Sequence, residues 1–363
     1  MPIRYPQIQG IRALAIIGIF LAHTTRWLPN HLSEFVPVAL RLGGAGVATF
    51  FIISGFLLAY KHNVVKIVEK TNVISTAWQK VKKLYVPHLI ALLLCLLLKL
   101  PETAYDWLVH FVIMLFHLTL TQSFIPYDAI INAFNAPSWF LSAFFGIWII
   151  IYLFPQSVNS LMNVSVRKCV YGIIAIFAIQ ILWMCFVKYG ISPVLPKRYL
   201  AWVHDWLVYK NPIICFSEFC VGILLGRLCA QKQLRVSTQN VIAILTALVV
   251  LAYGVLLLKS VISPSLSRMV VAEVFACVGI VAVMAPESVG YRILSKRVLV
   301  WMGDISGYFF LLHTPAIFLM RIMETQISPS WLILISFAFS LIMSGCISML
   351  YEWQRDRKES LYK

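Results

Sequence analysis

Residues 8–27 read IQGIRALAIIGIFLAHTTRW, an apolar run that contains Arg12 and His23. About 20 consecutive apolar residues are enough for a helix to cross a bilayer, so the run predicts a membrane-spanning helix. Ionisable side chains inside such a helix are costly and usually face the protein interior or an aqueous cavity. The two side chains therefore indicate a functional face on the first span.

Arg12 and His23 project from the same side of this predicted helix. Their separation of eleven residues corresponds to about 20° beyond three full turns and to a rise of about 16 Å. With the N-terminus in the cytoplasm, Arg12 lies near the inner end and His23 in the outer half. The alternative interpretation is that Arg12 snorkels to the headgroups and His23 is a hydrogen-bonded interior residue.

Apolar segments recur along the whole chain. Of the 363 residues, 61% are hydrophobic and 12% are charged, whereas a soluble protein carries about 25% charged residues. The candidate spans are 8–28, 43–60, 84–100, 106–124, 137–155, 167–187, 211–229, 239–259, 266–285, 298–320 and 331–351. This pattern predicts an all-α, polytopic membrane helical bundle in which residues 1–363 form a single domain.

The charge and the cysteines exclude other classes of protein. The net charge of +16 is spread over loops between the spans, where the positive-inside rule places basic residues, so we expect no nucleic acid partner. All eight cysteines lie in apolar segments without a CxxC motif. They predict small interior residues rather than disulfides or a metal site.

Loop charges also decide how many segments cross the bilayer. Segment 106–124 is the weakest candidate, because it contains an aspartate and two histidines. If it does not cross, the lysines and arginines gather on the cytoplasmic side, as the positive-inside rule requires. We therefore expect about ten transmembrane helices and both termini in the cytoplasm. Residues 62–83 then form a cytoplasmic surface helix, and residues 101–136 an external loop with an interfacial segment.

The stretch QGIRALAIIGIFLAHT resembles the opening helix of the acyltransferase-3 family, the membrane O-acetyltransferases of bacterial surface glycans. The arginine and histidine of that family's motif match Arg12 and His23. Further matches follow in the family's order: Gly46, Val47, Phe50, Phe51, Ser54, Gly55 and Phe56; Lys80, Lys83 and Pro87; Trp139, Leu141 and Ser142; Gly303, Ser306, Tyr308, His313 and Pro315.

The resemblance implies transfer of an acetyl group from cytoplasmic acetyl-CoA to a hydroxyl of a surface polysaccharide, such as lipopolysaccharide O-antigen or exopolysaccharide. It implies a lipid-linked or assembled glycan as acceptor and the bacterial inner membrane as location. The sequence departs from the family pattern at Gln9, where many members have aspartate, and at Phe144, where many have a carboxylate. Lysines replace the common arginines at Lys80 and Lys83, which removes bidentate contacts to the donor's phosphates.

Transfer to a hydroxyl requires a base, stabilisation of the oxyanion and a binding site for the donor. The expected catalytic residues are His23 and His313. The residues expected to bind acetyl-CoA are Arg12, Lys80 and Lys83. The residues expected near the acceptor are Trp139, Ser142 and Ser54, although a serine within a span also serves helix packing. No metal is expected.

A second hypothesis from another class is a membrane transporter or flippase. Arg12 and His23 on one helix face also suit a path for protons or substrate through the bilayer. We find no inverted sequence repeat of the kind common in transporters, which favours the enzyme. Consumption of a thioester by the purified protein distinguishes the two hypotheses.

Overall fold

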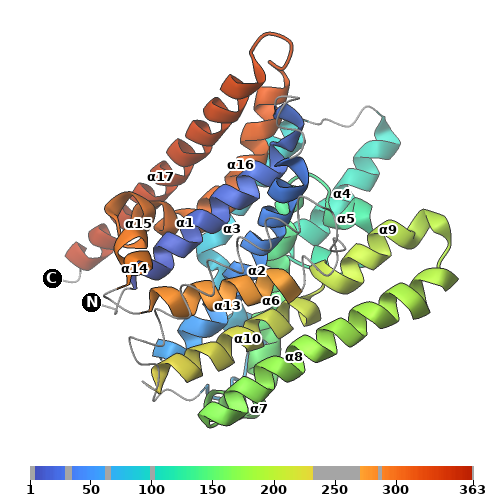
Figure 1. Cartoon of the computed structure of the whole chain (residues 1–363). Helices are drawn as coiled ribbons and strands as arrows, with labels where there is room; N and C mark the ends of the chain where they lie inside the picture. The colour runs from blue at the N-terminus through green and yellow to red at the C-terminus, as the bar shows by residue number, and fades with distance from the viewer. Residues whose placement is uncertain are drawn as a thin grey trace.

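The computed structural model describes residues 5–28, 35–61, 67–98, 103–231, 270–284 and 288–361. Within these ranges the chain is helical and contains no strand. The start of α1 and the end of α17 lie at the same end of the helical bundle (Figure 1). The all-α fold is thus confirmed for the described residues.

The helices of the first half are α1 (Pro6–His23), α2 (Val36–Lys61), α3 (Val73–Leu97), α4 (Ala104–Leu118), α5 (Asp128–Ile131), α6 (Trp139–Leu153), α7 (Pro155–Met162) and α8 (Val166–Phe186). Those of the second half are α9 (Lys197–Asp205), α10 (Pro212–Ala230), α13 (Ala272–Val283), α14 (Val289–Leu294), α15 (Arg297–Asp304), α16 (Ser306–Arg321) and α17 (Pro329–Leu361).

Helix α2 lies at the centre of the bundle and packs extensively on both α1 and α10. Glycines make both contacts possible. A Cβ atom on Gly46 would lie 2.6 Å from the carbonyl oxygen of Ala15 in α1. A Cβ atom on Gly55 would overlap the carbonyl oxygen of Phe219, and one on Gly222 would overlap that of Ile52. The backbones of α2 and α10 therefore touch directly, as small residues allow in membrane helices.

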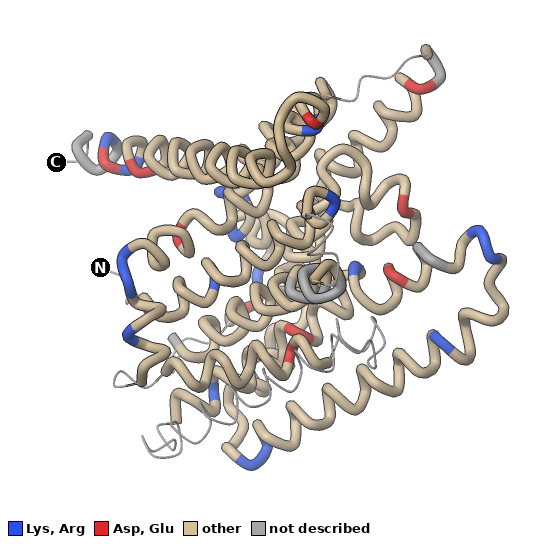
Figure 2. The backbone as a smooth tube through the Cα atoms, turned by 45° about the horizontal axis from the view of Figure 1, so that its top comes forward, with Lys and Arg blue, Asp and Glu red and all other residues tan. Residues whose placement is uncertain are grey.

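Among the described residues, five helical segments are long and apolar enough to cross a membrane: 43–60, 136–153, 166–194, 197–230 and 329–357. The expected number of about ten is not confirmed. Three predicted spans are not among the five. Helix α1 carries Arg12, and α16 and α13 are short, with 16 and 12 residues. The predicted span 239–259 lies outside the described residues. Most lysines and arginines lie at helix ends or in connections, with few inside the bundle (Figure 2).

Two predicted helices differ from the structure in their boundaries. A separate surface helix over 62–83 is wrong, because residues 67–72 are not helical and α3 then runs unbroken through Pro87 to Leu97. The side chain of Asn72 caps its start by accepting a bond from Ser75 N at 2.8 Å. The predicted span 298–320 is divided into α15 and α16 at Ile305.

Residues 103–136 contain α4 and α5. Helix α4 has 15 residues and exposes a row of apolar side chains, Trp107, Leu108, Phe111, Val112 and Leu115. Two histidines bind the buried side of α4 to its neighbours. His88 Nε2 donates to His117 O at 3.0 Å, and His117 Nε2 donates to Ile130 O at 2.8 Å. His117 is fully buried. An interfacial position for α4 stays a prediction.

The glycine contacts between α2 and α10 predict a large effect of a single methyl group. We expect Gly55→Ala or Gly222→Ala to destabilise the protein by about 1–3 kcal/mol or more, because the added Cβ meets backbone rather than a movable side chain. Thermal unfolding of the purified protein in detergent measures the effect. Gly279→Ala is the matched control, since a Cβ there meets no atom of the described residues within 4 Å. An equal loss in all three variants would contradict the interpretation.

Candidate active site

The two histidines expected to be catalytic lie in contact. His23 is the last residue of α1, and its ring centroid is 5.0 Å from that of His313 in α16, with the ring planes at 62°. His23 is exposed to a cavity of about 260 Å³, the outer cavity, whereas His313 is completely buried behind it. Two helices far apart in the sequence therefore bring both imidazoles to one place.

The hydrogen bond of His313 fixes the state of its ring. Nδ1 lies 3.3 Å from the carbonyl oxygen of Phe309, one turn earlier. A carbonyl only accepts, so Nδ1 carries the proton and Nε2 of the neutral ring is an acceptor. This Nε2 is buried and has no hydrogen-bond partner among the described residues. A neutral His313 thus carries an unprotonated, buried Nε2 on a ring that is in edge contact with His23.

A proline in the same helix frees a carbonyl that a residue before α6 then binds. Pro315 has no N–H, so it leaves the carbonyl of Leu311 without its helical partner. The buried Asn135 replaces this donor, with Nδ2 at 2.8 Å from Leu311 O. Phe134 beside it adopts a φ of 52°, which is unusual for a bulky residue. The turn that carries His313 is therefore held by a side chain from residues 101–136.

Arg12 faces a second, smaller cavity of about 130 Å³, the inner cavity, which is also lined by Ser54 and by aromatic side chains. Its Nη1 donates to Gln9 Oε1 at 3.0 Å, and its guanidinium lies 5.6 Å from the centroid of the Phe50 ring. Gln9 therefore keeps the orienting hydrogen bond without the charge of the family's aspartate. The hydroxyl of Ser54 donates to Phe50 O at 2.7 Å in its own helix.

A third cavity of about 690 Å³, the surface cavity, is lined by residues of α3, α15, α16 and α17. Lys82, Lys83 and Arg355 line it, together with Asp304 and Glu352. Lys80 is not among its lining residues, and its ammonium instead lies 4.7 Å from the centroid of the Trp148 ring. The structure thus separates the two lysines that we expected to share a donor site.

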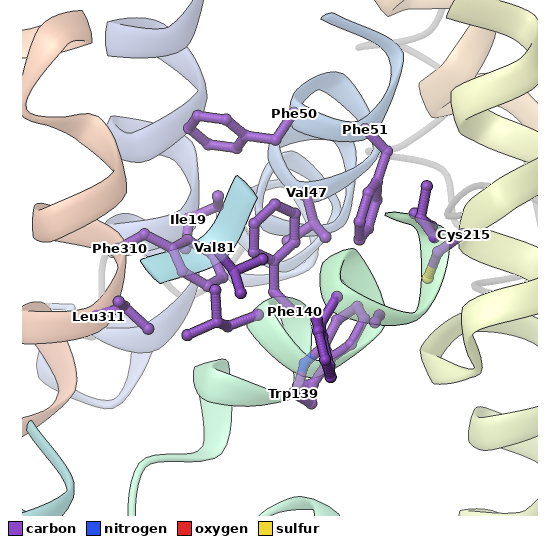
Figure 3. Close-up of a cluster of buried hydrophobic side chains, with 14 of the residues drawn as sticks. Ile19, Val47, Phe50, Phe51, Val81, Trp139, Phe140, Cys215, Phe310 and Leu311 are labelled. Carbon is purple, nitrogen blue, oxygen red and sulfur yellow. The ribbon is translucent and has the colours of Figure 1, made fainter. Parts of the chain in front are cut away.

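The three cavities follow one another. Lys83 and Tyr308 line the surface cavity, while their sequence neighbours Leu84 and Gly307 line the inner cavity. Phe310 lines both the inner and the outer cavity. It meets Phe140 at 5.0 Å and Phe50 at 6.2 Å between ring centroids, and the three rings converge from α16, α6 and α2 (Figure 3). These aromatic rings separate Arg12 from His23.

Of the residues expected near the acceptor, Trp139 alone lines the outer cavity. Its ring is in edge contact with Tyr209 at 5.0 Å between centroids. Ser142 is buried away from the cavities: its hydroxyl donates to Leu120 O at 2.7 Å and accepts from Ser123 N at 3.1 Å. It connects α6 to the preceding segment instead.

A polar group in the outer cavity was not predicted from the sequence. Asn132, Asp205 and Lys210 line it, and the Lys210 ammonium is 2.8 Å from Asp205 Oδ2 and 3.0 Å from Asn132 Oδ1. The charges in 205–210 were visible between two predicted spans, but their meeting with residue 132 was not. Within the described ranges no cluster of three or more histidine, cysteine or acidic residues could hold a metal.

A model of the acyltransferase domain family matches residues 5–351, nearly the whole chain. The chain belongs to the acyltransferase-3 family. It is also similar to the acyltransferase MdmB of Streptomyces mycarofaciens, with 27% identity over 331 residues that cover 86% of this chain and 78% of that protein. No solved structure matches. The protein is therefore a membrane acyltransferase, and the cavities form its candidate active site.

The bond from Asn135 to Leu311 predicts a measurable loss when it is removed. We expect Asn135→Ala to destabilise the protein by about 1–3 kcal/mol, because a buried carbonyl loses its donor, and to reduce acyl transfer. Thermal unfolding and an acyl transfer assay measure the two effects. Asn163→Ala is the control, since Asn163 also donates to a carbonyl, at 2.8 Å, but in an exposed position. Equal stability of both variants would contradict the role of Asn135.

Proposed function

We propose that this acyltransferase moves an acetyl group from cytoplasmic acetyl-CoA to a hydroxyl of a lipid-linked or assembled surface polysaccharide, such as lipopolysaccharide O-antigen or exopolysaccharide. The observation that carries the proposal is the series of three cavities, with Arg12 in the middle one and the His23–His313 pair in the last. Donor and acceptor thereby approach the reacting position from opposite ends.

His23 acts as the general base, because its imidazole is exposed to the outer cavity. It takes the proton of the acceptor hydroxyl while the hydroxyl oxygen attacks the thioester carbonyl. The tetrahedral intermediate then breaks its C–S bond, and the proton passes from His23 to the leaving thiolate. The products are the O-acetyl ester and CoA, so no further reactant is needed. General base catalysis of this kind contributes about 10²–10⁴-fold to the rate.

His313 positions His23 and does not touch the acceptor, since it is fully buried. Its edge contact restricts the orientation of the His23 ring, and its unprotonated Nε2 offers a second place for a proton. A pair of imidazoles with different exposure suits a base that must bind and release a proton in each cycle.

The donor enters from the surface cavity. Lys82, Lys83 and Arg355 suit the phosphates of the nucleotide end, and Arg12 suits a carbonyl or phosphate of the arm. Arg12 and His23 are separated along α1 by about 16 Å, which is close to the length of an extended pantetheine arm. For the thioester to reach His23, the arm must pass the ring of Phe310.

We place the protein in the bacterial inner membrane with both termini in the cytoplasm. The start of α1 and the end of α17 lie at one end of the bundle (Figure 1). Lys82 and Lys83 line the surface cavity together with Arg355 in the last part of α17. Cytoplasmic segments are rich in lysine and arginine, which supports this orientation. Family membership favours acyl transfer over the transporter or flippase hypothesis.

The different exposure of the two histidines predicts different effects of glutamine. We expect His23→Gln to reduce transfer about 10²–10⁴-fold, because glutamine cannot accept the proton. His313→Gln should retain measurable transfer with a flatter dependence on pH, since the base is still present. Acetylation of the acceptor is followed by mass spectrometry on both variants. Normal transfer by His23→Gln at normal expression would refute the assignment.

The separation of the two lysines predicts that only one contributes to donor binding. We expect Lys83→Ala and Arg12→Ala to raise the KM for acetyl-CoA several-fold, because each removes a positive charge from a cavity on the donor path. Lys80→Ala is the matched control, since Lys80 lies over Trp148. Steady-state kinetics with varied acetyl-CoA measure the change. A larger effect from Lys80 than from Lys83 would place the donor elsewhere.

A further inference from the structure

We propose that Arg26 and Arg321 bind the phosphate that links the acceptor glycan to its lipid carrier. The inference rests on the proposed function, because it chooses the lipid-linked acceptor over the assembled one for the same site. It starts from two arginines close to the histidine pair that no step of the transfer uses.

Both arginines lie just beyond the histidines on the same stretches of chain. Arg26 belongs to the single turn η1 (Thr25–Trp27), three residues after His23, and η1 packs on α17. Arg321 is the last residue of α16, eight residues and about 12 Å beyond His313. The positive charge of Arg321 acts on Arg26 and on the His23 imidazole. Two distant segments thus place two guanidinium groups close to the general base.

The contacts of the two arginines leave donors available. Arg26 Nη2 donates to both carboxylate oxygens of Glu324, at 3.0 and 2.9 Å, and among the described residues Nη1 and Nε have no acceptor. The guanidinium of Arg321 lies 5.0 Å from the centroid of the Phe318 ring and forms no ion pair within the same ranges. The side chains of Arg26 and Glu324 are 46% and 36% exposed. The three charged groups therefore carry an excess of one positive charge at an accessible place.

A phosphate fits both the arrangement and the position of these groups. A guanidinium binds two phosphate oxygens through its planar donors, and a phosphate has further oxygens for a second guanidinium. In the proposed orientation the arginines lie at the outer ends of the predicted spans 8–28 and 298–320, where the bilayer has its phosphates. The positive-inside rule accounts for basic residues at the cytoplasmic end only. An excess of positive charge at the outer end therefore indicates an anionic ligand.

The position beside His23 favours the phosphate of the glycan carrier over that of a bulk phospholipid. A glycan attached to a phosphate at this place lies next to the outer cavity, which His23 lines. A bulk phospholipid carries no glycan and would compete for the same place. Binding of a group outside the reacting centre holds the reacting atoms in position. The acceptor is thus acetylated while it is still attached to its lipid.

The experiment compares a prenyl phosphate with the same chain without phosphate. Farnesyl phosphate and farnesol are added separately to the full-length protein in detergent, and native mass spectrometry measures the dissociation constant of each. We expect the wild type to bind the phosphate about tenfold or more tightly, because hydrogen bonds between charged groups are the strong ones. The ratio of the two constants is taken within one variant, so a partial loss of folded protein cancels.

Three substitutions should move this ratio in opposite directions. Arg26→Gln and Arg321→Gln each remove one guanidinium and should reduce the preference for the phosphate about tenfold. Glu324→Gln removes the carboxylate that competes for Arg26 and should increase the preference several-fold. Damage to the fold would not produce a gain in one variant and a loss in the other two.

Two further cations serve as matched controls. Lys188 and Arg357 each lie over an aromatic ring of their own helical segment, as Arg321 does. Lys188→Gln tests the outer end of the bundle and Arg357→Gln the cytoplasmic end, and both variants should keep the wild-type ratio. Equal binding of the two probes by the wild type overturns the site, as does a loss in either control as large as that in Arg321→Gln.

A competing phospholipid and a transfer assay separate the remaining outcomes. Phosphatidylglycerol at the same concentration should leave farnesyl phosphate bound; displacement of most of it would assign the site to bulk lipid and overturn the carrier phosphate. A protein that shows the expected ratios but neither transfers nor hydrolyses acetyl-CoA contradicts the proposed donor and leaves the phosphate site standing. A protein that transfers acetyl groups but binds both probes equally overturns the phosphate site alone.

Discussion

The direct backbone contact of α2 with α10 is the constraint on which the site depends. Gly55 and Gly222 leave no room for a side chain on either helix, so the position of α2 is fixed on that side. The contact of Gly46 with α1 fixes it on the other. Phe50 and Ser54 are carried by α2 toward Arg12, and the aromatic partition then forms where α6 and α16 meet this helix. The glycines of one motif thereby determine a geometry that is built by four helices.

Arg12 shows how a charge is kept available within a bundle of apolar helices. Among the described contacts its closest partners are an amide oxygen of Gln9 and the face of the Phe50 ring. Both orient the guanidinium, and neither neutralises it with a full negative charge. An anionic partner at 3 Å would compete with any ligand for the same donors. The replacement of the family's aspartate by Gln9 therefore leaves the guanidinium more open to a donor.

Helical periodicity accounts for what the sequence could predict. Arg12 and His23 share a face through their spacing, whereas His313 was expected at the site only through the resemblance of its motif to the family pattern. The first half of α3, the break at Ile305 and the residues Asn132, Asn135, Asp205 and Lys210 were not. These four residues lie in short turns and irregular helices, where no repeat relates spacing to direction. Their positions depend on contacts of distant segments, such as the carbonyl that Pro315 leaves free.

The two ends of the site are built from different kinds of structure. The inner cavity is enclosed by long helices that glycines lock together, so a changed residue there disturbs several neighbours at once. The outer cavity takes Asn132, Asp205, Tyr209 and Lys210 from short connecting segments at the edge of the bundle. Such segments tolerate substitution and insertion far better than packed helices. Related enzymes can therefore diverge in the acceptor that they modify while the part of the site enclosed by long helices is inherited unchanged.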